Sequence, residues 1–512
     1  MRKFRGLILG SVAGLATVGA AQAADLPVKA KAVEYVKVCS LYGAGFYYIP
    51  GTDTCIKLGG YLRVDLAVNT NTDTLGNTNG AAGARNRLSN AYTWRSREDL
   101  NIDTRTATEY GVVRTFFDGT FSWTSGTYTS TGAGVTNYDV ISGTTSAAPG
   151  NGTAGGAGGG SLGVYYAFIQ FAGLTMGKAV SQFSAPWTAY PGNNFDGLVG
   201  GGGDVTGVNQ FSYTADFGQG ITASISAQDP TQYYQAGINN LAVPGTFGYG
   251  TSDYAGTYAP DFIGMVRVDQ AWGLVQASVA AHENHAAYYS PGVETSGHPS
   301  DKWGWAAQLA LSIKNVPTGA GDTINVSGVY TNGATRYNIH ENATPAGAAT
   351  IYGGTGLAGA YQSLGLGFAP DAVFATGGGL QLIETWGMRG AYTHNWDPQW
   401  NSALYGAYAA VHYNDTAKGL MCGAGGTVAT ALGAGLTTCN PDYNIAQLGV
   451  ITRWTPVKNL TFAADLTYMH IDQKYAGTTG AGASATVAKP AAVYELKDQN
   501  ALQLQLRVQR NW

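Results

Sequence analysis

The amino-acid sequence predicts an all-β fold, a 16-stranded antiparallel β-barrel that spans a membrane. Runs of alternating apolar and polar residues, each about ten residues long, fill most of the chain. The connections between these runs alternate between short and long, as in a closed membrane barrel. The last run alternates from Leu502 onward and ends on an aromatic ring, Trp512. Such rings are typical of the membrane interface, so we interpret Trp512 as a C-terminal assembly signal.

The first residues have the organisation of a secretory signal peptide. Residues 1–5 are basic, residues 6–20 are apolar, and Ala21-Gln22-Ala23 is a small-residue cleavage site. We therefore expect a signal peptide over residues 1–23. A membrane anchor is the alternative, but the apolar run is short for a spanning helix and rich in Gly, Ser and Thr. The prediction is an exported protein of the bacterial type.

The composition agrees with strands that have one lipid-facing and one water-facing side. The chain has 74 glycines and 32 tyrosines, only 12% of its residues are charged, and its mean hydropathy is −0.07. Glycine suits turns and long loops, and tyrosine suits the membrane interface. Loss of the leader's three basic residues changes the formal net charge from −4 to −7, because the leader has no acidic residue. A nucleic-acid partner is therefore not expected.

The four cysteines form two local pairs, Cys39 with Cys55 and Cys422 with Cys439. In an oxidising compartment, an even number of cysteines in local pairs predicts two disulfides. Two zinc half-sites are the alternative. The sequence has no CxxC motif and no histidine close to either pair, and its seven histidines are dispersed. We therefore expect neither a metal nor a cofactor.

The strands are expected within a barrel domain, residues 58–512, which follows an N-terminal segment with a disulfide loop, residues 24–57. Short turns such as residues 104–106 and 172–173 alternate with long polar stretches. A β-propeller or a periplasmic sandwich is the alternative, but neither predicts this strict alternation. The expected strands are residues 58–69, 91–103, 107–117, 161–171, 174–181, 208–216, 221–229, 261–269, 274–283, 303–314, 323–332, 379–395, 401–411, 444–454, 460–471 and 499–512.

Four segments resemble one known family. They are ADLPVK at residues 24–29, CSLYGAGFYYIPGTDTCIKLGGYLRVD at 39–65, RTATEYG at 105–111 and YAFIQFAG at 166–173. Together they resemble the alphaproteobacterial outer-membrane porins of the Brucella/Rhizobiales type. The resemblance implies a trimeric, 16-stranded general-diffusion porin whose third external loop folds inward and narrows the pore. The chain departs from the family in its long Gly/Ser/Thr loops at residues 120–160 and 332–378.

The predicted inner wall carries a group of arginines. The alternation places Arg63 and Asp65 on one side of the first strand, and Arg95 and Arg97 on one side of the second. Because closure places the last strand beside the first, Arg507 is expected beside them. We predict one basic stretch of inner wall, which Arg114 is a further candidate to join. The alternative is that these residues are solvated and have no special role.

The third long loop, residues 182–207, is expected to form the constriction. It contains Asp196 and Asp204 but no lysine or arginine. Acidic residues on this loop, opposite arginines on the wall, would set a transverse field across the narrowest point. Such a field orients water and disfavours apolar solutes. An ordinary external loop is the alternative reading.

These observations predict an outer-membrane porin that forms a water-filled passive channel for small hydrophilic solutes and ions. Its expected partners are outer-membrane lipid and two further copies in a homotrimer. Glu98 lies among residues predicted to face lipid, which a subunit interface or a β-bulge would explain. A substrate-specific channel, for example for sugars, is the first alternative, and an outer-membrane phospholipase is the second. No Ser/His pair supports an enzyme.

Overall fold

The structure is a computed structural model. It describes residues 37–69, 86–87, 92–124, 161–187, 198–201, 207–231, 234–243, 245–339, 348–483 and 489–512. The predicted signal peptide, residues 1–23, lies outside these residues. In the part of the chain that the structure describes, no helix has the length and apolar character needed to cross a membrane.

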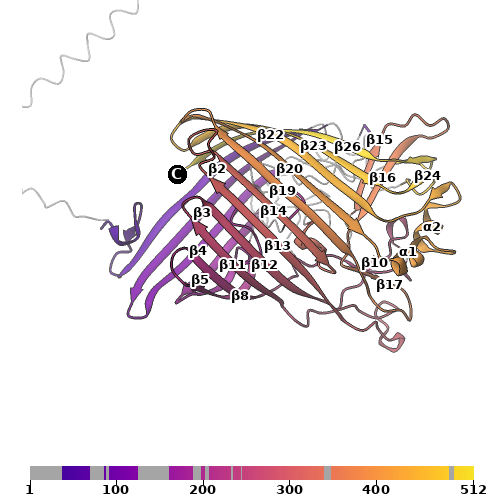
Figure 1. Ribbon diagram of the computed structural model, residues 1–512, viewed down its shortest axis with the longest axis horizontal. Coiled ribbons are helices and arrows are strands. Elements are labelled where there is room, and N and C mark those ends of the chain that lie inside the picture. The colour runs from indigo at the N-terminus through magenta and orange to yellow at the C-terminus, as the bar shows by residue number, and fades with distance from the viewer. Residues whose placement is uncertain are drawn as a thin grey trace, which may run out of the picture.

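The main sheet is a closed barrel (Figure 1). It has 17 strands, of which β1 (Tyr47–Tyr48) pairs only with the start of β2, so 16 strands form the ring. Closure comes from the pairing of β26 with β2, in which Val64 lies opposite Val508. The predicted fold class is confirmed. In chain order the ring is β2 (Thr54–Asn69), β3 (Tyr92–Thr108), β4 (Gly111–Thr124), β5 (Ser161–Phe171), β6 (Leu174–Ala179), β7 (Val208–Asp216), β8 (Ile221–Gln228), β11 (Asp261–Gln270), β12 (Gly273–Asn284), β13 (Lys302–Lys314), β14 (Thr323–Asn332), β19 (Glu384–Asn395), β20 (Trp400–His412), β22 (Tyr443–Val457), β23 (Leu460–Gln473) and β26 (Gln499–Asn511).

One predicted turn is wrong. Residues 104–106 were expected to connect two strands, but they continue β3, where Thr106 pairs with Val113. The turn is Glu109-Tyr110, and the positive φ of +119° at Gly111 follows it. Threonine favours extended backbone, so a Thr-rich segment without glycine continues a strand more readily than it turns.

The outer face of the barrel carries two levels of aromatic rings. On β20, Trp400 and Tyr408 both point outward, as does Leu404 between them, which is 57% exposed. Trp400 stacks on Trp454 at 5.7 Å, and Tyr408 lies 5.2 Å from Trp386. The two levels are about 27 Å apart along the strand, or about 20 Å across a membrane at a tilt of about 40°. This spacing fits the apolar band of an outer-membrane barrel.

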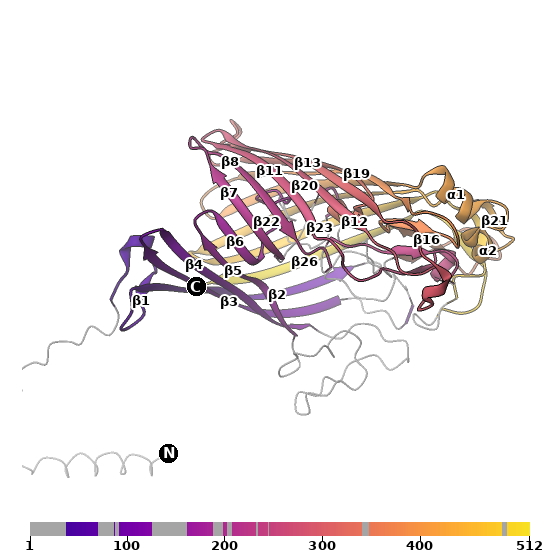
Figure 2. The same cartoon turned by 90° about the horizontal axis from the view of Figure 1, so that it is seen from below.

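The two ends of the barrel differ. Every hairpin turn is short at the end where β1 and the C-terminus lie, which we call the short-turn end (Figure 2). At the other end, long connections fold into additional structure, which we call the cap. The cap contains a four-stranded sheet and a five-stranded sheet, with two helices. Its elements are β9 (Ile238–Asn240), β10 (Thr251–Ser252), β17 (Ala372–Phe374), β18 (Gln381–Leu382), β15 (Ala348–Gly353), β16 (Gln362–Phe368), β25 (Tyr494–Leu496), β24 (Ala476–Thr479), β21 (Leu436–Thr438), α1 (Asp415–Cys422), α2 (Thr427–Leu432), and the 3-10 turns η3 (Thr246–Gly248), η4 (Glu294–Ser296) and η5 (Thr335–Tyr337).

The cap packs against the inner face of the barrel. Leu364 and Leu366 of β16 join one buried cluster with Ile445 of β22 and Ile471 of β23. These wall residues are inward-facing yet apolar, and all four side chains are fully buried. Burial of a leucine or isoleucine side chain stabilises the fold by about 1.5–3 kcal/mol. The cluster therefore holds the cap firmly inside its end of the barrel.

Both predicted disulfides are present. Cys39 and Cys55 join the 3-10 turn η1 (Ser40–Tyr42) and its flanking chain to the start of β2, with their Cα atoms 6.0 Å apart. Cys422 and Cys439 join the end of α1 to the residue after β21, with their Cα atoms 5.5 Å apart. The first disulfide therefore fixes the short-turn end, and the second fixes the cap.

Asp322 ends the turn between β13 and β14 at the short-turn end. Its carboxylate accepts hydrogen bonds from Thr318 Oγ1 at 2.6 Å, His394 Nδ1 at 2.7 Å, Tyr392 OH at 2.9 Å and Asn395 N at 2.9 Å. Burial alone would raise the pKa of this carboxyl, but the hydrogen bonds outweigh burial and hold the pKa well below its ordinary value. Asp322 therefore joins the turn to β19.

Candidate functional site: the inner wall and the third loop

Three neighbouring strands bring the predicted arginines together. Arg63 of β2 lies directly opposite Arg97 of β3. Asp65, two residues further along β2, pairs with Arg95 of β3 on one side and with Arg507 of β26 on the other. All five side chains point into the barrel, because Leu62 and Trp94 in the opposite phase are about half exposed on the outer face.

The arginines differ in whether they form an ion pair with Asp65: Arg95 and Arg507 do. The Asp65 carboxylate accepts a hydrogen bond from Arg507 Nε at 2.6 Å and from Arg95 Nη2 at 2.6 Å. The Asp65 side chain is only 3% exposed, and the two arginine side chains are 10–11% exposed. Two guanidinium groups therefore share one carboxylate, and the predicted basic stretch contains an ion-paired centre.

Arg63 and Arg97 are held in a different way. Arg63 Nε donates to Gln509 Oε1 at 2.8 Å, and its guanidinium lies 4.3 Å from the centre of the Tyr61 ring. Arg97 Nε donates to Ser122 Oγ at 2.9 Å. Among the described residues, Arg63 forms no ion pair. Because Gln509 is neutral, it orients the Arg63 side chain without cancelling the charge of the guanidinium.

A further inward-facing arginine was missed in the sequence analysis. Arg453 of β22 lies near Arg507, and Asp465 on the neighbouring strand lies opposite Ile451. Asp465 Oδ1 accepts a hydrogen bond from Tyr405 OH at 2.6 Å. The alternation of residues 444–454 carries the signal, because Arg453 shares its phase with Gln447. We call Arg63, Arg95, Arg97, Arg453 and Arg507 the arginine arc.

Arg114 is paired with an acidic residue near the short-turn end. Its Nη2 donates to Asp103 Oδ2 at 3.0 Å, and its Nη1 donates to Gln170 Oε1 at 3.0 Å. The guanidinium also lies 5.0 Å from the ring of Phe116 and 5.5 Å from that of Phe168. The structure therefore places Arg114 in a cluster with Asp103 and two aromatic rings, outside the arginine arc.

The third long connection runs inward, as predicted. We call residues 180–207, between β6 and β7, the inward loop. Its first part follows the inner wall: Gln182 Oε1 accepts a hydrogen bond from Ser224 Oγ at 3.1 Å. The carbonyl oxygen of Ser184 accepts one from Gln276 Nε2 at 3.0 Å. Both partners lie in the middle of barrel strands, so the loop descends below the mouth.

The described part of the loop's far side reaches the opposite wall. Val199 N donates to Gln447 Oε1 on β22 at 3.0 Å, and Gly200 N donates to the carbonyl oxygen of Asn338 at 3.0 Å. Gly200 has φ of +89°, and a Cβ atom there would lie 2.3 Å from the Met388 carbonyl oxygen. Glycine is required for this approach. In the ring order, β22 is on the far side from β6, so two described parts of the loop lie against opposite walls of the barrel.

Side chains fill the interior on one side of the inward loop. Phe183 from the loop, Ile263 from β11, Val329 from β14 and Tyr337 from η5 belong to one buried cluster. The rings of Phe183 and Tyr337 lie 4.6 Å apart. The arginine arc lies elsewhere in the ring, on β22, β26, β2 and β3. The acidic residues predicted to face it, Asp196 and Asp204, lie outside the described residues.

Trp512 lies at the short-turn end beside β2. Its backbone N donates to the carbonyl oxygen of Gly60 at 3.2 Å, and its ring lies against the same glycine. A Cβ atom at Gly60 would meet the Trp512 ring at 3.0 Å. The terminal aromatic residue therefore packs at the seam where the last strand meets the first.

Comparison with known proteins agrees with this architecture. A family model described as "Porin subfamily" matches residues 25–505. Porin Omp2b of Brucella abortus is 31% identical over 316 residues, which cover 61% of this chain and 75% of the relative. Porin Omp2b of Brucella melitensis is 30% identical over 320 residues, with the same coverage. The outer membrane channel DcaP of Acinetobacter baumannii has a similar fold, with a TM-score of 0.54 at 15% identity, over 91% of this chain and 99% of that one.

Proposed function

Because this chain belongs to the porin subfamily, we propose that small hydrophilic solutes and ions cross it by general diffusion along the arginine arc. The protein is an outer-membrane channel for passive diffusion. The family points to a channel rather than an enzyme.

One observation carries the proposed route. The buried cluster of Phe183, Ile263, Val329 and Tyr337 fills part of the barrel interior beside β11 and β14. On β2 and β26, elsewhere in the ring, the wall is polar and charged: Gln509 continues the row that holds Arg507, and Arg63, Arg507 and Gln509 are all partly exposed. Water and ions require polar groups along their path, so the passage follows the arginine arc.

The inward loop supplies the second side of this passage. In the proposal, Asp196 and Asp204 are the acidic groups opposite the arginine arc. Opposite charges across a narrow opening produce a transverse field that orients water, and an apolar solute cannot replace the interactions of that water. The sign of the ion preference then follows from the balance between the two sides.

The test is single-channel recording of the purified protein in a planar bilayer, with a reversal potential measured under a salt gradient. We expect large ohmic steps whose size depends on salt concentration and little on solute identity. Conductance that one sugar blocks at low concentration would contradict general diffusion.

A substrate-specific channel is the second candidate, and one observation favours it. Phe116 and Phe168 face the interior near the short-turn end with their rings 5.4 Å apart, and the Arg114 guanidinium lies over both rings. Aromatic faces with adjacent charged donors are suited to sugars. Block of the current by maltooligosaccharides, weakened by Phe168→Ala, would support this candidate.

We propose that the channel assembles as a homotrimer surrounded by outer-membrane lipid. Glu98 lies on the outer face of β3, opposite Leu62 and Phe121. The pairing of β3 is regular there, so a bulge does not explain the carboxylate, and Glu98 forms no ion pair with the described residues. A carboxylate facing lipid is costly, whereas a subunit interface can solvate or pair it. Conductance steps that arrive in threes would support the trimer. Single conductance steps, together with a monomer mass in native mass spectrometry, would contradict it.

A further inference from the structure

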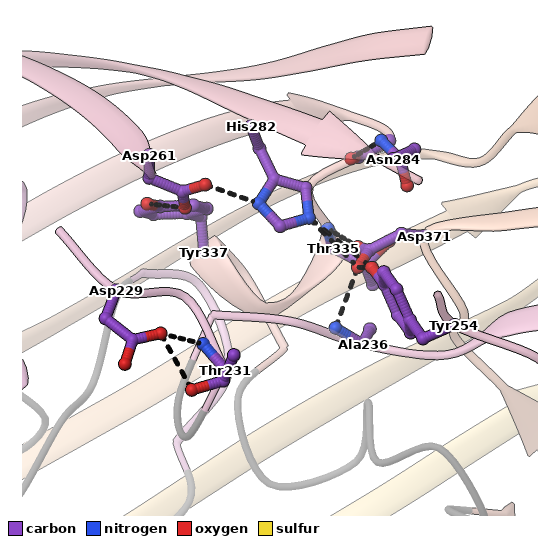
Figure 3. Close-up of polar contacts among 11 residues, drawn as sticks. Asp229, Thr231, Ala236, Tyr254, Asp261, His282, Asn284, Thr335, Tyr337 and Asp371 are labelled. Carbon is purple, nitrogen blue, oxygen red and sulfur yellow. Dashed lines mark hydrogen bonds and ion pairs between the residues drawn. The ribbon is translucent and has the colours of Figure 1, made fainter. Parts of the chain in front are cut away.

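A buried ionic cluster lies where the cap meets the barrel wall (Figure 3). Asp261 of β11 and His282 of β12 point inward from neighbouring strands, and Asp371 comes from the cap. His282 Nδ1 lies 2.7 Å from Asp261 Oδ1, and His282 Nε2 lies 3.5 Å from Asp371 Oδ2. All three side chains are fully buried. We call these three residues the His282 clamp.

Asp371 connects the clamp to several parts of the cap. Its Oδ1 accepts a hydrogen bond from Thr335 N at 2.6 Å. Its Oδ2 accepts bonds from Ala236 N at 2.7 Å and from Tyr254 OH at 2.9 Å. The three donors belong to two different long connections, β8–β11 and β14–β19. One carboxylate therefore ties both connections to the same point on the wall.

The charges of the clamp depend on one another. Both nitrogens of His282 face carboxylates, which only accept hydrogen bonds when ionised, so this geometry suits an imidazolium that donates twice. The other groups that donate hydrogen bonds to the Asp261 and Asp371 carboxylates are neutral. Burial and the Asp261 carboxylate raise the pKa of Tyr337 well above its ordinary value, and burial and Asp371 do the same to Tyr254. Loss of the imidazole would leave two buried carboxylates without a cation, which is strongly unfavourable.

The clamp is also connected to the inward loop. Tyr337 OH donates to Asp261 Oδ2 at 2.5 Å, and the Tyr337 ring packs against Phe183 at the start of the inward loop. The next residue, Asn338, accepts hydrogen bonds from Gly200 N through both its carbonyl oxygen, at 3.0 Å, and its side-chain Oδ1, at 3.1 Å. The short segment that the clamp holds therefore contacts the inward loop in two of its described parts, at Phe183 and at Gly200.

We propose that the His282 clamp positions the inward loop inside the barrel. Its three residues act through Tyr337 and Asn338, so they are positioning residues that do not line the passage. The effect on conductance rests on the proposed function, in which the inward loop is the narrowest part of the channel. Loss of the clamp releases the loop from Asn338 and widens or destabilises the passage.

The experiment reports loop position directly by thiol labelling. All four native cysteines are in disulfides, so an introduced cysteine is the one free thiol. Val199 is suitable because its side chain is 1% exposed and lies on the far part of the loop. The labelling rate of Val199→Cys with a maleimide is compared alone and combined with His282→Gln. The matched control is His285→Gln, because His285 lies three residues later and pairs with Asp301 at 2.8 Å outside the clamp.

We expect His282→Gln to raise the labelling rate of the introduced cysteine on the order of 100-fold. The two buried carboxylates lose their cationic partner, so the segment that holds the loop opens more often. His285→Gln should leave the rate within about two-fold, since exposed pairs contribute little. Tyr337→Phe removes one hydroxyl and keeps the ring, so it serves if His282→Gln does not fold, as judged by heat-modifiable migration on gels. Its expected increase is about five-fold, corresponding to one lost hydrogen bond.

Unchanged labelling in a folded His282→Gln or Tyr337→Phe protein would overturn the proposal. The same variants are then recorded in bilayers without the introduced cysteine. Faster labelling with altered conductance supports both the clamp and the constriction. Faster labelling with unchanged conductance supports the clamp and contradicts the part of the proposed function that places the constriction at the inward loop.

Discussion

Replacement of Asp65 by asparagine tests the charge balance of the arginine arc. Asp65→Asn keeps the shape of the side chain but removes the carboxylate that Arg95 and Arg507 share, each at 2.6 Å. The charge along the passage rises by one unit. Because the three side chains are nearly buried, we expect the free energy of unfolding to fall by about 3 kcal/mol, as when one partner of a buried ion pair is removed.

The effect on ions follows from Coulomb's law. An ion that passes about 5–8 Å from the changed group in water gains or loses about 0.5–0.8 kcal/mol. Because anions gain what cations lose, the ratio of anion to cation permeability should rise about six- to sixteen-fold. Screening over a Debye length of about 10 Å in 0.1 M salt reduces the change to about two- to five-fold.

The assay is the reversal potential under a ten-fold potassium chloride gradient. The expected change in permeability ratio corresponds to a shift of about 15–30 mV toward the anion equilibrium potential. The matched control is Asp397→Asn, which removes the same charge from the exposed turn between β19 and β20. A folded Asp65→Asn channel whose reversal potential stays within a few millivolts of wild type would refute the route along the arginine arc.

Three further predictions concern stability and assembly. Cys39→Ser combined with Cys55→Ser should lower the free energy of unfolding by about 3 kcal/mol, because the disulfide closes a loop between two residues 16 positions apart. An unchanged thermal midpoint of unfolding under non-reducing conditions would contradict this prediction. Asp322→Asn should be less stable than wild type at neutral pH. Since the folded-state pKa of Asp322 is depressed, its stabilisation is complete above the unfolded pKa of about 4 and is lost as the pH falls further, so the two melting curves should converge in acid. Trp512→Ala should lower the amount of folded barrel in outer-membrane fractions, and normal amounts would exclude an assembly role.

The local pattern of the sequence accounts for most of the barrel. The 16 strands were predicted in the observed order, and most lie within a few residues of their predicted bounds, because alternation with a period of two depends only on neighbouring residues. For the same reason the phase of Arg95 and Arg97 was predicted correctly: both side chains are inward and buried. The disulfide pairs were also predictable, since each joins cysteines close in the chain.

The contacts between side chains on neighbouring strands were harder to predict from the sequence. Closure of the barrel predicts that Arg63 and Arg507 lie on neighbouring strands. The register that places Asp65 opposite both Arg95 and Arg507 depends on where the strands end, and residue propensities locate strand ends only approximately. The error at residues 104–106 shows the difficulty, because threonine suits both a strand and the start of a turn.

The sequence by itself therefore determined the class of fold, the number of strands and the side of each strand that faces water, because these follow from local alternation. Only the tertiary structure decided how the long connections fold. Their residues have no period to read, and the contacts of Asp371 with Thr335, Ala236 and His282 join segments up to 135 positions apart. Such contacts depend on the closure of the whole barrel, which brings distant chain segments to the same buried point.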